Sequence, residues 1–410
     1  MFRLLIIGYV WPEPKSSAAG SRMMQLIETF QLLDYQTTFA SPCEKRKQAF
    51  DLESIGISQK SIEVNSSTFD EFVTELNPDV VLFDRFMMEE QFGWRVSENC
   101  PSALRILDTE DLHGLRKGRH QAFKDQKLFE RTYLLNDTFK RELASIYRSD
   151  LSLIISEYEM DLLVHDLHID KSLLAYLPFM EDRLEDEVIA QLPNFEARQH
   201  FITIGNFLHE PNYQAVLYLK KNIWPLIRKQ LPKAEMHVYG AYALQKVLQL
   251  HNEREGFIIK GFADDVDRVM QHAKVCLAPL QFGAGLKGKL IDAMKNGTPC
   301  IMSTIAAEGM FGNLESNGFI EENPTDFANK AVQLCTDENQ WKTKQQNGFK
   351  VLNTRFNKET NQKEFIARLQ QLQENLENHR LNNSIGQMLQ HQTLQSTKYM
   401  SKWIEEKNRP

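Results

Sequence analysis

Short apolar runs alternate with amphipathic segments along this chain in two successive series, and this double alternation most constrains the fold. The strands expected in the first series are Arg3–Tyr9, Thr37–Ala40, Val80–Asp84, Leu104–Asp108 and Leu151–Ser156. Those expected in the second series are Phe201–Gly205, Glu235–Tyr239, Phe257–Lys260, Val275–Ala278 and Cys300–Met302. Strands that alternate with helices are typical of parallel sheets covered by helices. The sequence therefore predicts an α/β protein with two Rossmann-like domains in tandem.

Amphipathic segments supply the helices between these strands. The expected helices include Phe69–Leu76, Glu157–His165, Tyr213–Gln230, Ala243–Asn252, Val266–His272 and Lys289–Asn296. A proline inside a helix removes a backbone donor, so we expect the helix that contains Pro225 to bend there.

An acidic, proline-punctuated stretch from Pro178 to Arg198 interrupts the pattern and marks the domain boundary. The expected division is residues 1–180 for the N-terminal domain, 181–357 for the C-terminal domain and 358–410 for a helical extension. A chain of 410 residues exceeds the roughly 250–300 residues at which single cores stop growing, which supports two domains.

The extension has no strand pattern. Phe365, Leu369 and Leu372 form an apolar stripe for docking. The segment after Asn375 is polar, but it still carries large hydrophobic residues, namely Leu376, Leu381, Ile385, Met388, Leu389, Leu394, Tyr399, Met400 and Trp403. We expect these side chains to pack on a partner surface, since a disordered tail would carry fewer of them.

Composition excludes several classes of protein. The net charge of -7 argues against general nucleic-acid binding. The five cysteines are scattered singly, without the close pairs of a zinc or redox centre, which indicates reduced thiols. Neither a secretory signal nor a membrane span is evident, so we expect a cytoplasmic protein.

The stretch Leu277–Pro299 runs from a strand through a glycine-rich loop into a helix. Gly283, Gly285 and Gly288 would let backbone N–H groups approach an anion, at the positive end of the following helix. Lys287 and Lys289 would add charged donors, and Asp292, one turn later, could accept hydrogen bonds from ribose hydroxyls. The alternative is that the glycines form turns and that the lysines are solvated.

Several motifs in order resemble glycosyltransferase family 4. They are Arg3–Gly20, Leu107–His113, Phe201–Phe207, Lys260–Asp265, Phe282–Pro299 and Ala307–Met310, and together the resemblance spans roughly residues 3 to 375. It implies a GT-B fold, in which two Rossmann-like domains face each other across a cleft. It also implies transfer of a hexose from a nucleotide diphosphate sugar, with retention of anomeric configuration and without a metal or a separate cofactor, in cell-envelope polysaccharide synthesis.

The resemblance also assigns site residues. It implies that His113 lines the sugar pocket and that Lys287 acts with it in catalysis. Gly20 would approach the donor phosphate or the acceptor, and Asp292 would bind the ribose. The full set of implied donor-binding residues is Gly20, Gly205, Asn206, Gly261, Phe262, Gly283, Gly285, Leu286, Lys287, Lys289 and Asp292. Lys287 and Lys289 are taken as exposed, so their removal should change donor binding and barely change folding.

Two departures from the family pattern bear on function. Ala284 stands where the family often has a second glutamate, and Asn206 and His209 stand near a position that is commonly basic. A catalytically silent relative that binds a nucleotide sugar or a partner enzyme is therefore an alternative, and a sugar-nucleotide epimerase is a third. The sequence names neither the nucleotide nor the acceptor, which could be a saccharide or a lipid-linked molecule.

Two acidic groups could be taken for metal sites. Asp265 and Asp267 spell a DxD, but they stand at the start of an expected helix, where capping carboxylates are favoured. The loop with Asp108, Glu110, Asp111 and His113 offers mixed carboxylates and one histidine, which favours a polar cleft wall over a metal centre.

Residues 116–148 hold nine lysines or arginines against four acids. A solvated helical pair is one interpretation. A face for an anionic acceptor at the inner surface of a membrane is the other. The hydrophobic tail leaves homo-oligomerisation open as well.

Overall fold

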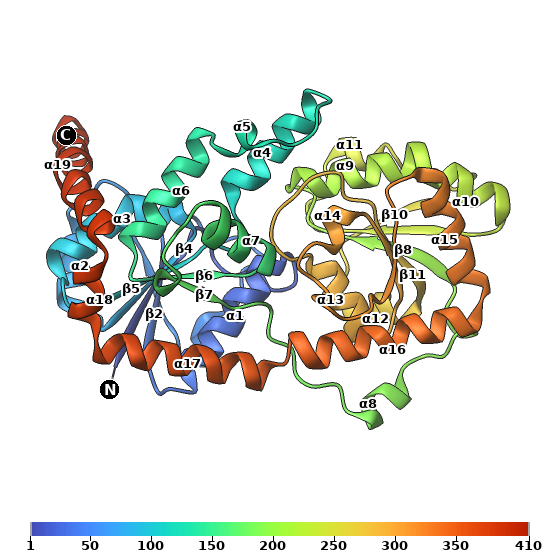
Figure 1. Cartoon of the computed structure of the whole chain (residues 1–410), viewed down its shortest axis with the longest axis horizontal. Coiled ribbons are helices and arrows are strands. Elements are labelled where there is room, and N and C mark those ends of the chain that lie inside the picture. Colours follow the sequence, from blue (N-terminus) through green and yellow to red (C-terminus); the bar gives the residue numbers. More distant parts are fainter. Residues whose placement is uncertain (1, 409–410) are drawn as a thin grey trace.

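The computed structural model describes residues 2–408, and the side chains of all of these except 394 and 395. It shows two α/β domains side by side, with the two successive helices of residues 338–374 running beneath them, one under each domain (Figure 1). The two domains and the helical extension agree with the fold class expected from the sequence.

Seven parallel strands within these residues form the N-terminal sheet, in the order β3-β2-β1-β4-β5-β6-β7. Their bounds are β1 Arg3–Ile7, β2 Gln36–Ser41, β3 Ser58–Ser61, β4 Val80–Asp84, β5 Leu104–Asp108, β6 Leu151–Ile154 and β7 Leu174–Tyr176. The direction of winding reverses between β1 and β4. Ligands of open α/β sheets bind at the carboxyl ends of strands beside such a reversal.

The helices of this domain are α1 Ala18–Gln31, α2 Thr68–Leu76, α3 Phe86–Asn99, α4 His113–Lys124, α5 Arg131–Leu134, α6 Asp137–Arg148 and α7 Glu157–Asp161. Successive residues of a strand face different cores. Leu5 and Ile7 of β1 pack in one apolar cluster, whereas Leu4 and Ile6 pack in another together with Phe30 of α1. Burial on both faces explains why the inner strands read as continuous apolar runs.

The C-terminal sheet has six parallel strands among the described residues, in the order β10-β9-β8-β11-β12-β13. Their bounds are β8 His200–Ile204, β9 Met236–Tyr239, β10 Phe257–Gly261, β11 Ala273–Ala278, β12 Cys300–Met302 and β13 Gly318–Ile320. The reversal here lies between β8 and β11, so both sheets turn a reversal point toward the space between the domains.

The helices that follow Tyr176 include α8 Asp186–Gln191, α9 Glu210–Tyr218, α10 Trp224–Gln230, α11 Gln245–Leu248, α12 Val266–His272, α13 Gly288–Lys295, α14 Thr304–Ala307, α15 Pro324–Thr336 and α16 Glu338–Arg355. The expected helix over 213–230 is interrupted before its proline. A π-helical segment, Leu219–Ile223, joins α9 to α10, and Pro225 lies in the first turn of α10, where its missing N–H costs nothing.

Three short strands were not expected from the sequence: β3, β7 and β13. The residues of β3 are all polar, and β7 and β13 have three residues each. Each lies at the edge of its sheet, where half-burial weakens the apolar pattern that reveals inner strands.

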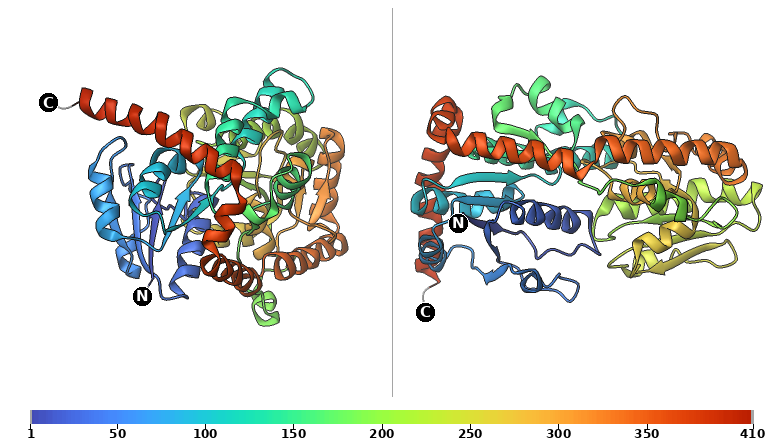
Figure 2. Two further views of the ribbon diagram at one scale, coloured as in Figure 1. Left: turned by 60° about the vertical axis from the view of Figure 1, so that its left-hand side comes forward. Right: turned by 90° about the horizontal axis from the view of Figure 1, so that it is seen from below.

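The chain returns to the N-terminal domain at its end, through α17 Lys358–Glu374, α18 Leu376–Asn382 and α19 Ser384–Lys407. Seen from below, α16 and α17 cross the length of the molecule, and α19 lies across its far end (Figure 2). Phe365, Leu369 and Leu372 of α17 are buried in the apolar cluster that contains Leu4 of β1. The docking stripe expected from the sequence is confirmed.

Six of the tail hydrophobes are not covered by the rest of residues 2–408, so their packing on a partner surface stays a prediction. Their exposed fractions are 79% for Leu381, 45% for Ile385, 62% for Met388, 63% for Tyr399, 58% for Met400 and 58% for Trp403. The side chain of Leu394 lies outside the described residues. No helix within residues 2–408 has both the length and the apolar character needed to cross a bilayer.

Candidate functional site

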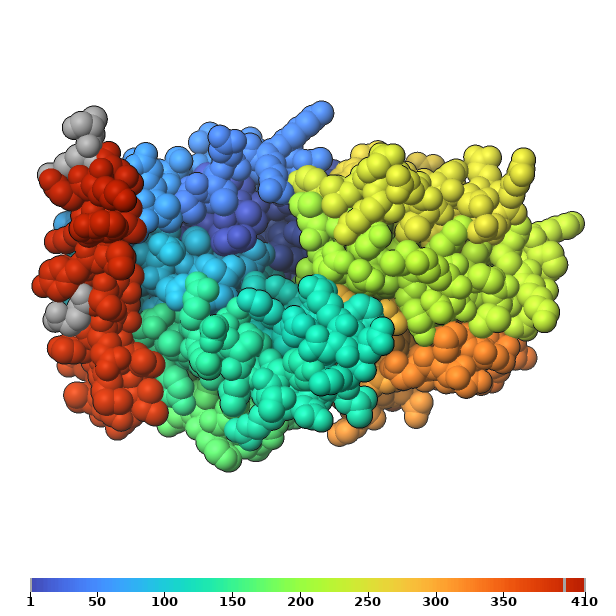
Figure 3. Space-filling model, turned by 90° about the horizontal axis from the view of Figure 1, so that it is seen from above, coloured from blue at the N-terminus to red at the C-terminus, as the bar shows by residue number. Residues whose placement is uncertain are grey.

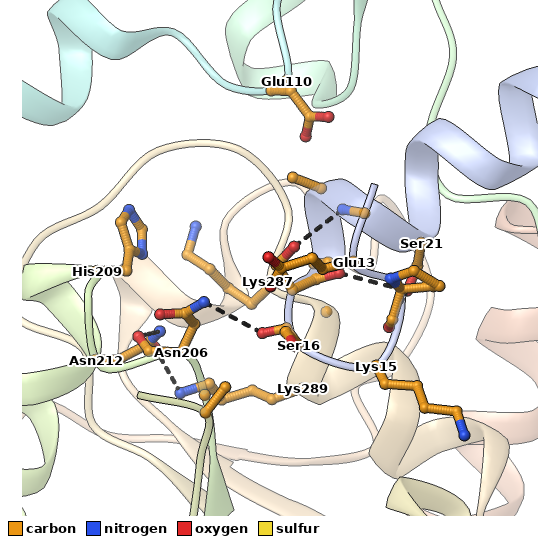
Figure 4. A pocket seen from close by; sticks show the side chains of 18 of the residues that line it. Glu13, Lys15, Ser16, Ser21, Glu110, Asn206, His209, Asn212, Lys287 and Lys289 are labelled. Carbon is orange, nitrogen blue, oxygen red and sulfur yellow. Dashed lines mark hydrogen bonds between the residues drawn. The ribbon is translucent and has the colours of Figure 1, made fainter. Parts of the chain in front are cut away.

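A cleft of about 1250 Å³ lies between the domains and is lined by residues from both (Figure 4). The carboxyl ends of β1, β4 and β5 border it on one side, and the loops after β8 and β11 border it on the other. Beside it, the Arg119 guanidinium donates to both carboxylate oxygens of Glu308, at 2.8 and 2.7 Å, and closes the domains against each other. The cleft therefore combines both reversal points in one cavity.

The glycine-rich loop after β11 forms one wall of the cleft. Gly285 has a φ of +64°, and a Cβ there would lie 2.7 Å from Asp111 Cβ. A Cβ on Gly288 would lie 2.8 Å from Ala18 Cβ. Glycine is required at these positions because the N-terminal domain approaches so closely, a reason that adds to the anion-binding geometry expected from the sequence.

Glu159 of α7 holds this loop from the opposite domain. One of its carboxylate oxygens accepts the N–H of Gly285 at 2.8 Å and the N–H of Leu112 at 3.0 Å. Burial raises the pKa of Glu159 to about 8, with a further contribution from the charge of Asp111. A backbone donor expected to meet a diphosphate is thus occupied by a carboxylate oxygen in this structure.

The two lysines of the loop differ in environment. Lys287 is only 7% exposed, and its Nζ donates to the carbonyls of Ala284 at 3.1 Å and Gly285 at 2.5 Å. Lys289 lies in the cleft wall, where its Nζ donates to Asn212 Oδ1 at 3.0 Å. Burial lowers the pKa of each lysine to about 8. The assumption that both lysines are exposed is wrong, because Lys289 is half-buried and Lys287 is buried, where its side chain braces the loop.

Asp292 lies one turn into α13 and lines the cleft. Burial raises its pKa to about 7, and the carboxylates of Glu181 and Asp267 add to the shift. The structure therefore places an acidic group whose pKa is near neutral pH one turn beyond Lys289 on the same helix.

The other C-terminal residues assigned by resemblance lie at strand ends. Gly205, Asn206 and Phe262 line the cleft, and Phe262 is 38% exposed. Asn206 Nδ2 donates to the carbonyl of Ser16 across the cleft at 3.3 Å. Gly261 is not among the cleft-lining residues described in 2–408; it ends β10, and its carbonyl accepts the Gly240 N–H.

The loop after β1 supplies the N-terminal wall. Gly20 lines the cleft in the first turn of α1, and a Cβ there would lie 2.4 Å from the carbonyl of Glu13. The Glu13 carboxylate accepts the Tyr242 hydroxyl at 2.7 Å, which ties this loop to the opposite domain. Gly20 is thus needed for the loop's own packing as well as for its position in the cleft.

His113 begins α4 in the cleft wall. Its Nδ1 lies 3.0 Å from the carbonyl of Asp111 and 3.6 Å from Glu142 Oε1. Its ring meets Phe86 edge-on. These contacts fix the ring, so His113 is oriented by its neighbours and faces the same cavity as Lys289.

Two of the carboxylates near His113 are paired with arginines. Asp108 accepts from Arg22 at 2.9 Å, and Asp111 accepts from Arg116. No group of three potential metal-ligating side chains occurs among residues 2–408. The polar cleft wall expected from the sequence agrees with these contacts.

The DxD pair also has structural contacts. Asp265 caps α12 by accepting the N–H of Arg268 at 2.9 Å, which confirms the capping interpretation. Asp267 accepts from Asn296 Nδ2 at 2.7 Å and from Lys295 Nζ at 3.3 Å.

Arg85 is a cleft residue that the sequence reasoning missed, whereas Glu110 was expected there as part of the polar wall. Glu110 lines the cleft with a φ of +62°, and burial together with the charge of Asp108 raises its pKa to about 8. Arg85, with a φ of +71°, lines it beside Tyr9. Arg85 directly follows the carboxyl end of β4, a strand that borders the reversal point, and that position was the available signal.

Comparisons with known proteins agree with this geometry. Residues 198–337 match the family model for glycosyl transferases group 1. No curated protein sequence matches the chain. Among solved structures, sucrose-phosphate synthase from Thermosynechococcus elongatus has a TM-score of 0.66 at 15% identity, covering 91% of this chain and 99% of that chain.

HepE from Anabaena, in complex with UDP and glucose, has a TM-score of 0.67 at 14% identity, covering 90% of this chain and 100% of that chain. TarM has a TM-score of 0.67 at 10% identity, and the match covers 90% of this chain and 98% of that chain. At such identities the similarity shows the fold, and it confirms the GT-B architecture expected from the sequence.

Proposed function

We propose that this chain, whose residues 198–337 form a group 1 glycosyl transferase domain within a GT-B fold, transfers a hexose from a nucleotide diphosphate sugar to an acceptor hydroxyl. The proposal rests on the groups that share one wall of the cleft. There the N-terminus of α13, Lys289 and Asp292 face the cavity together with Phe262. The helix N-terminus and Lys289 suit a diphosphate, the Asp292 carboxylate suits a ribose, and the Phe262 ring offers a surface on which a base can stack.

The chemistry required of the protein is modest. The departing diphosphate develops negative charge, which the lysines and the helix dipole would stabilise. His113 would line the sugar pocket opposite them. Closure of the domains, held by contacts such as Arg119–Glu308, would exclude water from the donor. Retention of anomeric configuration belongs to this proposal, and NMR of the product anomer tests it.

Screening nucleotide diphosphate sugars by thermal shift tests donor binding directly. A ligand at about 100 times its dissociation constant stabilises the folded state by roughly 2.7 kcal/mol. UDP-glucose is the first donor to try, because HepE of similar fold is crystallised with it. Nucleoside and nucleoside diphosphate serve as controls. Failure of every nucleotide sugar to raise the midpoint would reject the proposal.

Turnover separates the alternatives. A silent relative would bind the nucleotide sugar without hydrolysing or transferring it, whereas an epimerase would convert the donor with no acceptor present. Slow release of free sugar and nucleoside diphosphate, accelerated by an acceptor saccharide or lipid, is the outcome expected of a glycosyltransferase.

Metal independence is expected as part of the proposal. Asp265 and Asp267 are engaged as a helix cap and as acceptors of Asn296 and Lys295. Donor binding and turnover should therefore be unchanged after treatment with EDTA. Loss of activity that manganese or magnesium restores would contradict this expectation.

Donor affinity is expected to peak between about pH 7 and pH 8. Below a pKa of about 7 Asp292 is protonated and loses its capacity to accept two ribose hydroxyls, so affinity should fall as pH falls. Above about pH 8 Lys287 and Lys289 lose charge, so affinity should fall as pH rises. Calorimetric titration with a nucleotide sugar measures both limbs.

Asp292→Asn provides the control for the acidic limb. It should bind more weakly at pH 7.5 and lose the dependence below pH 7, while the alkaline limb stays. An acidic limb that persists in Asp292→Asn would assign the titration to another group, with Glu110 the next candidate because burial raises its pKa as well.

A further inference from the structure

The outward face of α19 carries large apolar side chains that no other part of residues 2–408 covers. Its exposed residues recur at helical spacing and fall on one side: Ile385, Met388, Tyr399, Met400 and Trp403. In the space-filling view the helix forms the outer end of the molecule, with the N-terminal domain behind it (Figure 3). Soluble domains rarely leave such a stripe uncovered without a binding partner.

The opposite face of α19 is firmly held, so the helix presents this stripe in a fixed position. Gln390 Nε2 donates to the carbonyl of Arg148 at 2.8 Å, and Arg95 donates to Ser401 Oγ at 3.1 Å. Gly386 lies so close to the carbonyl of Tyr147 that a Cβ would approach it to 2.2 Å. Glu405 accepts from the backbone and hydroxyl of Ser67. The stripe is a preorganised surface.

We propose that α19 pairs antiparallel with α19 of a second copy of this chain. The spacing of its residues is self-complementary about the middle of the helix. An antiparallel pair centred there sets apolar against apolar and polar against polar, in the pairs Ile385–Trp403, Met388–Met400, Leu389–Tyr399 and Gln392–Ser396. Such a contact is isologous, so each pair occurs twice and the assembly closes as a dimer.

Charge agrees with this direction. Lys407 is exposed at the end of the stripe, where its ammonium lies over the Trp403 ring. A parallel pair would set Lys407 level with its own copy, which is unfavourable, whereas an antiparallel pair places the two lysines at opposite ends. A membrane surface fits less well, since the outward flank carries Glu406 beside Lys402 and Lys407 and so lacks the basic excess of interfacial helices.

The kind of side chain also favours a contact between copies. The five side chains are 45–63% exposed, and Tyr399 and Trp403 are aromatic residues of the kind that dominate the energetics of interfaces. The cleft lies away from α19, toward the junction of the domains, so a dimer of this kind leaves both sites open (Figure 1).

Sedimentation velocity of the full chain tests the pairing. The wild type is expected to be a dimer at micromolar concentration. Met388→Glu and Trp403→Glu should each raise the dimer dissociation constant by at least about 30-fold, since each replaces two apolar contacts of the symmetric pair by charges. Gln387→Glu, which adds the same charge to an exposed position off the stripe, should leave it unchanged. Circular dichroism spectra should match that of the wild type in all three variants, because the replaced side chains are exposed and the fold does not depend on them.

Cross-linking tests the direction, in a background where Cys43 and Cys335 are serine. Copies of Ser396→Cys should link to each other, since they would lie about 6 Å apart along the axis, whereas Met388→Cys copies, about 18 Å apart, should not. Met388→Cys mixed with Met400→Cys should link. Self-linking of Met388→Cys would overturn the antiparallel arrangement.

Two further outcomes would reject the proposal. One is a wild type that stays monomeric to about 100 µM, well above micromolar dissociation constants. The other is a monomer that cosediments with phosphatidylcholine–phosphatidylglycerol vesicles and loses this binding in Trp403→Glu, which would assign the face to a lipid surface. A dimer that persists in both glutamate variants would place the interface elsewhere.

Discussion

Replacing Lys289 with alanine is expected to weaken the binding of a nucleotide diphosphate sugar by about 10- to 150-fold. A hydrogen bond to a charged group contributes roughly 1.5–3 kcal/mol. The Lys289 ammonium has three donors, and Asn212 Oδ1 is the one acceptor within hydrogen-bonding distance among residues 2–408. It lies in the cleft wall at the start of α13, where a diphosphate would receive the remaining donors.

Two controls make this prediction specific. Lys363→Ala removes the same charge from an exposed position on α17 and should not change the affinity. Free nucleoside should bind Lys289→Ala as well as it binds the wild type, because it has no diphosphate. Equal affinity of Lys289→Ala and wild type for the nucleotide sugar would move the donor site away from α13.

Lys287 should behave differently from Lys289. Its Nζ satisfies the carbonyls of Ala284 and Gly285 inside the loop, so Lys287→Ala leaves buried acceptors without a donor. Leaving a buried polar group unsatisfied costs about 1–3 kcal/mol. We therefore expect Lys287→Ala to lower the thermal midpoint and donor affinity together, whereas Lys289→Ala lowers the affinity alone.

The contrast between these lysines shows where the sequence is informative about the site. The glycine-rich loop, its helix and the position of Asp292 follow from local pattern and resemblance. The burial of Lys287 does not, because it depends on the path of the loop carbonyls and on Glu308 and Arg119 from other elements. Side-chain environment at an interdomain contact is set by residues far apart in the sequence.

The same distinction holds for the fold. The inner strands β4, β5 and β12 have the bounds expected from the sequence, since residues buried on both faces give continuous apolar runs. Edge strand β3, with the sequence Ser58-Gln-Lys-Ser61, has no apolar signal and is specified by backbone pairing with β2. The helix expected over 213–230 begins three residues earlier, at Glu210, and ends at Gln230 as expected; its interruption lies at residues 219–223 and so begins before Pro225.

The glycines of the loop were likewise predicted only in part. Their positions follow from the sequence pattern, but glycine is required at 285 because Asp111 lies close to it, and at 288 because Ala18 does, and both neighbours belong to the other domain. The sequence therefore identified the positions and supplied only part of their physical cause.

Arg22 is the buried cation whose removal should most affect stability. Its guanidinium is fully buried and donates to Asp108 through Nη2 at 2.9 Å and through Nε at 3.0 Å. Its Nη1 donates to the carbonyl of Leu177 at 2.6 Å. Arg22 thus joins α1 to the end of β5 and to the segment that leads into the second domain. The end of β5 directly precedes the loop that leads to His113.

Arg22→Met is expected to lower the free energy of unfolding by about 3–5 kcal/mol, because it leaves the Asp108 carboxylate buried without a counter-charge. The double variant Arg22→Met with Asp108→Leu should recover part of that loss, since no charge then remains buried. Lys140→Ala, which breaks a pair whose side chains are 64% and 95% exposed, should change stability by less than about 0.5 kcal/mol. Urea unfolding followed by circular dichroism measures all three. If Arg22→Met proved as stable as Lys140→Ala, or if the double variant were less stable than the single one, the buried pair would not be what holds the end of β5 in place.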